Sequence, residues 1–117
     1  MLIAAAVLTS LVALVFLATG VAKLLGHPKM VEASEHLGYS MRTFRVIGLL
    51  EVLGAVGILL APLCFPLGIA AATGLILLTI GGSIAHLRAS DPVTLAAPAL
   101  VCGLLTAAAL GVQIAAA

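Results

Sequence analysis

Three ionisable residues, Lys23, Glu51 and His86, interrupt or end long apolar segments of this chain of 117 residues. A charge inside the hydrocarbon of a membrane is costly, and such residues are usually kept because they pair, bind a ligand or transfer a proton. A carboxyl group, an imidazole and an ammonium group can together hold the polar head of a lipophilic molecule, or carry out acid–base chemistry. Lys23, Glu51 and His86 are therefore the candidate catalytic residues.

Small or hydroxyl-bearing residues lie one helical turn from each of the three: Thr19 and Gly20 near Lys23, Gly48 and Gly54 near Glu51, and Gly82 and Ser83 near His86. Neighbours at i±3 and i±4 share a helix face, and small faces indicate close contact between membrane helices. We expect the three side chains to point into a bundle and to meet at one mouth. The alternative is an internal salt bridge that only fixes the helix register. The candidate substrate-binding residues are Thr19, Gly20, Gly48, Gly54, Thr79, Ser83 and Cys102, with Arg88 and Asp91 at the rim.

The composition indicates a membrane protein. The chain is 64% hydrophobic and 8% charged, and its mean hydropathy is +1.39. An ordinary soluble domain is about 45–50% apolar and about 25% charged. About 20 apolar residues cross a bilayer as a helix. The sequence therefore predicts an all-α integral membrane four-helix bundle, with residues 1–117 forming one domain and with helices at about 2–25, 41–61, 66–87 and 92–115.

The positive charges predict the orientation in the membrane. All 5 Lys and Arg residues fall in the two connections after the first and third apolar segments. Because cytoplasmic loops are rich in Lys and Arg, these connections are expected in the cytoplasm and both termini on the outer side. The link at about 26–40 is read as a short amphipathic helix on the headgroups, or else as a solvated connector. Asp91 is expected to cap the last helix, which contains Pro98.

Several functions are excluded or disfavoured by what the sequence lacks. A basic cluster for nucleic acid is missing, and the two cysteines, Cys64 and Cys102, do not form a C-x-x-C motif. They are expected to be free thiols. His27, His36 and His86 are not spaced as metal ligands. We therefore expect no metal site, and we expect His27 and His36 to lie in solvent.

Three segments carry a resemblance to a known family. Phe16–Leu24 (FLATGVAKL), Gly48–Leu60 (GLLEVLGAVGILL) and His86–Arg88 (HLR) resemble the DoxX-like family of small four-helix membrane proteins, over roughly residues 10–100. The name-giving members are linked to a thiosulfate:quinone oxidoreductase, and other relatives to membrane oxidoreductase complexes or to receptor assembly. The resemblance implies a quinone as the candidate cofactor and a site at Gly20, Lys23, Glu51, Gly54 and His86.

Three hypotheses of function follow. The leading one is the binding of a lipophilic molecule, quinone-like or isoprenoid-like, in a membrane redox system. The second is a membrane enzyme that opens an epoxide or isomerises an isoprenoid, with Glu51 as base or nucleophile and His86 or Lys23 as acid. The third is a non-catalytic assembly partner that packs its glycine faces against another membrane protein. The expected partners are the lipid bilayer, a lipophilic small molecule, and a homo-oligomer or a membrane redox complex. The expected location is a bacterial inner membrane, and the Ala-rich, Lys-poor composition suggests a GC-rich genome.

Overall fold

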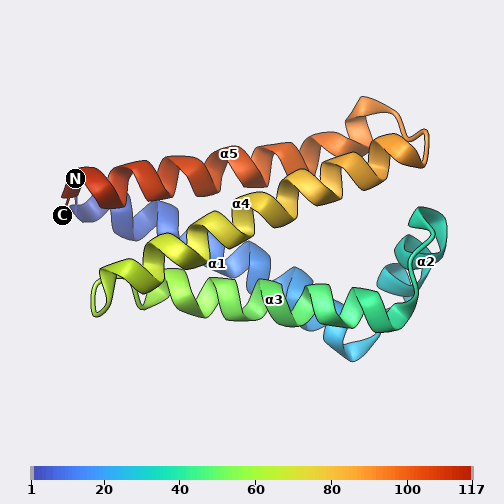
Figure 1. Cartoon of the computed structure of the whole chain (residues 1–117), viewed down its shortest axis with the longest axis horizontal. Coiled ribbons are helices and arrows are strands. Elements are labelled where there is room, and N and C mark those ends of the chain that lie inside the picture. Colours follow the sequence, from blue (N-terminus) through green and yellow to red (C-terminus); the bar gives the residue numbers. More distant parts are fainter. Residues whose placement is uncertain (1, 117) are drawn as a thin grey trace.

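Helices make up almost the whole of the computed structural model, which describes residues 2–116. Within this range the chain forms five helices and no strand (Figure 1): α1 (Leu2–Leu25), α2 (Pro28–Leu37), α3 (Met41–Leu59), α4 (Phe65–Arg88) and α5 (Val93–Ala116). The four long helices begin and end within two residues of the predicted bounds. The prediction of an all-helical membrane protein is confirmed.

Three of the long helices, α1, α4 and α5, are long and apolar enough to cross a membrane. The fourth, α3, is shorter, with 19 residues. It also carries three charged residues, Arg42, Arg45 and Glu51, of which Glu51 lies in its middle. These charges are what separate α3 from the three clear candidate spans.

The long helices form a ring. α1 packs against α3 and α5, and α4 packs against the same two helices. The start of α1 and the end of α5 lie together at one end of the molecule, which we call the terminal end. α2 and the α4–α5 connection lie at the opposite end, the α2 end (Figure 1). The longest dimension, 42 Å, exceeds the ~30 Å hydrocarbon core of a bilayer, so the polar α2 end can project beyond it.

Close packing is concentrated toward the terminal end. The main buried cluster includes Val12, Phe16, Ile58, Leu75 and Ala109. At the same end, the Gln113 side-chain amide donates a hydrogen bond to the Thr9 hydroxyl at 2.8 Å, which joins α5 to α1. From there α1 and α5 diverge toward the α2 end, so the α1/α3 pair and the α4/α5 pair are arranged as a wedge that widens toward that end (Figure 1).

Two glycines let α1 and α3 touch backbone to backbone. A Cβ atom at Gly20 would lie 2.7 Å from the Gly48 carbonyl oxygen, and a Cβ at Gly48 would lie 2.7 Å from the Gly20 carbonyl oxygen. Real Cβ atoms essentially never come this close to backbone atoms. Small residues at a crossing are the usual means of close approach between membrane helices. This crossing places Lys23 on α1 directly against α3, because a Cβ at Gly48 would also meet the Lys23 Cβ at 2.8 Å.

The short helix α2 is defined by local sequence signals at both ends. Pro28 occupies its first turn, and the His27 ring accepts a hydrogen bond from the Lys29 amide. Gly38, with φ of +80°, ends it in the left-handed conformation. Gly26, with φ of +69°, ends α1 in the same way. Two turns that favour glycine therefore flank α2.

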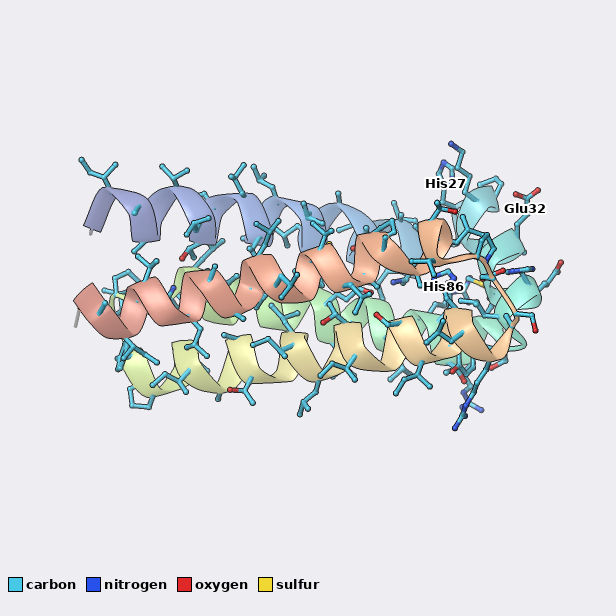
Figure 2. All side chains as sticks on the ribbon, turned by 90° about the horizontal axis from the view of Figure 1, so that it is seen from above. His27, Glu32 and His86 are labelled. Atoms are coloured by element: carbon cyan, nitrogen blue, oxygen red, sulfur yellow. The ribbon has the colours of Figure 1, made fainter. Side chains whose placement is uncertain are left out.

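The expected short amphipathic helix in the link is present as α2. α2 contacts α1, α3 and α4, and its Ser34 is only 1% exposed. Its apolar residues Met30, Val31 and Leu37 are half-buried against the bundle. The remaining face, with Lys29, Glu32 and Glu35, is exposed. Figure 2 shows Glu32 pointing away from the long helices.

The start of α5 corrects one prediction. α5 begins at Val93 and contains Pro98, as expected. The Asp91 carboxylate, however, accepts no hydrogen bond from the described amides of α5, and its oxygens bond to histidine rings instead. Ser90, with φ of +60°, takes the left-handed conformation that turns the chain between α4 and Asp91.

The α1–α3 crossing can be tested by adding one methyl group. Gly48→Ala forces the two backbones apart, and we expect it to reduce the free energy of unfolding by about 1–3 kcal/mol, the usual cost of overpacking. Gly74→Ala is the matched control, because a Cβ there meets nothing within 4 Å, and it should stay within about 1 kcal/mol of the wild type. Unfolding in detergent measures both. Equal stability of the two variants would contradict the crossing.

Candidate functional site

A buried ion pair joins α1 to α3. The Lys23 ammonium donates to Oε1 of Glu51, and the Thr19 hydroxyl, one turn earlier on α1, donates to Oε2 at 2.5 Å. The side chains of Lys23 and Glu51 are only 15% and 5% exposed. The ammonium also lies 5.3 Å from the centre of the Phe44 ring, a cation–π distance. Both oxygens of Glu51 therefore have donors, and the positive charge has two partners.

Such a pair needs good geometry to be stable. Taking two charges out of water costs several kcal/mol for each ion, which mutual attraction offsets only when the remaining polar atoms also find partners. The Gly20–Gly48 contact supplies the geometry, since it fixes Lys23 one turn from the crossing. Thr19 supplies the additional donor.

A second polar cluster lies at the α2 end. The carboxylate of Asp91, in the α4–α5 connection, bonds to Nδ1 of His86 at 2.8 Å and to Nε2 of His36 at 2.5 Å. The Asp91 side chain is only 5% exposed. The hydrogen bonds from His86 and then from His36 hold the pKa of Asp91 below its usual value of 3.8.

These bonds set the proton positions on the two rings. An ionised carboxylate only accepts hydrogen bonds, so Nδ1 of His86 and Nε2 of His36 must carry the protons. In neutral His86 the opposite nitrogen, Nε2, is then a hydrogen-bond acceptor, and in protonated His86 it is a donor. Within residues 2–116 this nitrogen has no hydrogen-bond partner. His86 is thus oriented by Asp91 and retains one ring nitrogen for a ligand.

Between the helices lies a cavity of about 520 Å³, within the range of about 300–1,000 Å³ typical of small-molecule sites. All five helices contribute to its lining, and α2 supplies Met30, Ala33 and Leu37. Most of the lining is apolar. The residues with polar groups are Thr19, Lys23, Tyr39, Glu51, Thr79, His86 and Cys102. Both polar clusters therefore reach the same cavity, from opposite helix pairs.

The residues expected at the site fall into three groups: those that line the cavity, those that pack helices together, and those at the rim. Lys23, Glu51 and His86 share the cavity wall with Thr19, Thr79 and Cys102. Four others serve packing: Gly20, Gly48, Gly54 and Ser83 lie at contacts between helices or hydrogen-bond within their own helix. At the rim, Asp91 lies behind His86, while Arg88 is exposed and does not line the cavity.

Lys23, Glu51 and His86 were expected to meet at one place, but they form two separate pairs. Lys23 and Glu51 are in direct contact, but His86 pairs with Asp91 and not with Glu51. His36, which we expected in solvent, is half exposed and also binds Asp91.

Two contributions to the site were missed in the sequence. Phe44 lies on the same face of α3 as Gly48 and Glu51, at a spacing of four and then three residues, so the helical period could have indicated it. The bond from His36 to Asp91 spans 55 residues. No local pattern predicts such a pair.

The fold and the cavity define a class of protein: a helical membrane protein with a largely apolar, partly open cavity between its helices and two paired polar clusters. A model of the DoxX-like family matches residues 7–109. The chain therefore belongs to the DoxX-like family, as the resemblance of its motifs implied. No curated protein and no solved structure matches it.

The ion pair can be tested by removing one partner and then both. Lys23→Met leaves the Glu51 carboxylate buried without its cation, and we expect a loss of about 3 kcal/mol in the free energy of unfolding. The double variant Lys23→Met/Glu51→Leu leaves no buried charge at the pair and should recover most of that loss. A double-mutant cycle in detergent measures the coupling. Additive effects of Lys23→Met and Glu51→Leu would show that the two residues do not interact.

Proposed function

We propose that the protein binds a lipophilic small molecule in this cavity, with the polar head of the molecule at Lys23 and His86. The carrying observation is that two fixed polar groups reach one mostly apolar cavity of about 520 Å³. The ammonium of Lys23 is held by Glu51 and Phe44, and the ring of His86 by Asp91. Groups held in this way lose little freedom when they bind a ligand, which favours affinity.

The charges favour a neutral head. Lys23 and Glu51 cancel each other, and the Asp91 carboxylate behind His86 adds a negative charge. Among the lining residues in the described part of the chain there is no arginine, the residue best suited to phosphate. A carbonyl or hydroxyl group can accept from the Lys23 ammonium or bond to Nε2 of His86. Quinone-like and isoprenoid-like molecules both fit this description, and the family resemblance favours a membrane redox system.

Binding is favoured over catalysis by Glu51. Both oxygens of Glu51 accept hydrogen bonds from side chains of α1, one from Thr19 and one from Lys23. The role that fits Glu51 is to hold Lys23 in place. His86 retains a nitrogen that can exchange a proton with a bound molecule, which suits a ligand whose head gains and loses protons.

We further propose that all four long helices cross a bacterial inner membrane, with the α2 end in the cytoplasm. α3 has 19 residues and is about 28 Å long, close to the ~30 Å hydrocarbon core. Lys29 lies in α2, and the other four Lys and Arg residues lie at the ends of α1, α3 and α4 that adjoin it, as the positive-inside tendency requires.

This orientation predicts which side of the membrane Cys64 faces. Cys64 is exposed in the α3–α4 turn, at the end opposite α2. A membrane-impermeant thiol reagent added to intact spheroplasts should therefore label it, in a Cys102→Ser background. Labelling only after the membrane is opened would contradict the orientation.

Filling the cavity tests the proposed function. A Cβ at Gly82, which lines the cavity, meets only the Ala99 Cβ at 3.9 Å, so Gly82→Leu should fold and occupy ligand space. Gly74→Leu is the matched control, because Gly74 has open space and lies outside the cavity. We expect wild type and Gly74→Leu to bind short-chain ubiquinone or farnesol, and Gly82→Leu to bind at least tenfold more weakly. The measurement is equilibrium binding in nanodiscs.

A competition experiment with a charged lipid tests the preference for a neutral head. Phosphatidylglycerol carries a phosphate and should not displace the neutral probes. If neither neutral probe binds the wild type, or if Gly82→Leu binds as well as Gly74→Leu, the proposed function fails.

A further inference from the structure

The cavity is covered at its polar end by a helix whose contacts with the bundle are sparse. α2 contributes Met30, Ala33 and Leu37 to the cavity lining and rests on α1, α3 and α4. Its opposite face carries exposed charged residues. α2 therefore lies between the ligand space and the water at this end.

One hydrogen bond ties this cover to the bundle. Within residues 2–116, the bond from His36 to Asp91 is the single side-chain hydrogen bond between α2 and another element. The same carboxylate holds His86, which lines the cavity. Asp91 thus connects the cover and the cavity wall directly.

The ends of α2 are suited to movement. Gly26 and Gly38 flank the helix in the left-handed conformation, and a Cβ at Gly38 would meet nothing within 4 Å. Hinges are commonly a few residues at element ends that absorb backbone rotation. Rotation at these two turns would lift α2 as a unit without disturbing the ring of long helices.

We propose that α2 is a lid on the cavity and that the hydrogen bond between His36 and Asp91 is the latch that holds it closed. Opening the lid gives the polar end of the cavity access to water, and closing it excludes water. The lid would control access to the cavity, and its purpose rests on the proposed function, the binding of a ligand there. The movement itself can be measured without any ligand.

Cys102 reports on the lid, because its side chain lines the cavity. In a Cys64→Ser background, it is the one remaining thiol. A charged methanethiosulfonate reagent can approach it only through water, whereas N-phenylmaleimide dissolves in the bilayer and can approach through lipid. The ratio of the two labelling rates, measured in nanodiscs, therefore reports opening at the polar end.

His36→Ala removes the latch, and Glu32→Ala is its matched control on the same helix, since Glu32 points away from the bundle (Figure 2). We expect His36→Ala to raise the labelling rate with the charged reagent about tenfold, the size of change that one hydrogen bond to a charged group can produce. Glu32→Ala should change that rate less than twofold, and the maleimide rate should stay constant in both. Asp91→Ala, which removes the acceptor, should reproduce the increase.

Two outcomes overturn the lid. One is an equal charged-reagent rate in His36→Ala and Glu32→Ala, and the other is no labelling by that reagent in any variant. If the neutral probes fail to bind but His36→Ala still raises the charged-reagent rate, the proposed function is wrong and the lid is supported. If the probes bind but His36→Ala does not raise that rate, the lid is wrong and the proposed function is supported.

Discussion

The ion pair between Lys23 and Glu51 is the constraint on which the rest of the arrangement depends. It exists in a mostly apolar protein only because α1 and α3 approach closely enough for a short, shielded contact. Gly20 and Gly48 make that approach sterically feasible, and Thr19 and Phe44 complete the surroundings of the two charges. The contact between α1 and α3 therefore explains three features together: the glycines at the crossing, the buried ion pair beside it, and the polar groups that the pair gives to the cavity wall.

One end of the bundle is closely packed, and the other end holds the cavity. Toward the terminal end, small and branched side chains from the long helices pack into the main buried cluster. Toward the α2 end, the two helix pairs separate, and the space between them is a cavity instead of a core. Packing is looser where the helix pairs separate, and the two polar clusters add contacts there. One cluster joins α1 to α3, and the other joins α2 to the α4–α5 connection and to α4. The two polar clusters therefore both hold the helices together at this end and supply the polar groups of the cavity.

The sequence predicted the long helices well because each is a long apolar segment bounded by proline, glycine or charge. It also indicated Lys23 and Glu51, since a charge within an apolar segment stands out and a small-residue face gives its direction. It was wrong about Asp91, whose position before a proline is typical of a helix cap. The carboxylate instead binds His36 and His86, and that choice depends on how α2 folds back over the bundle. The sequence predicted α2 as an amphipathic helix, but its packing on the bundle was missed for the same reason: an amphipathic pattern does not say whether lipid or protein covers the apolar face.

The central claim is that the wedge between the helix pairs holds a molecule with a neutral head beside Lys23 and His86. The most direct measurement is an experimental structure of the protein purified in nanodiscs from its own membrane, with density in the cavity at side-chain detail. The account predicts elongated density along the apolar walls that ends within hydrogen-bond distance of the Lys23 ammonium or the His86 ring. A wedge closed by contact between the helix pairs, or one filled by a phospholipid tail whose phosphate lies outside, would contradict it.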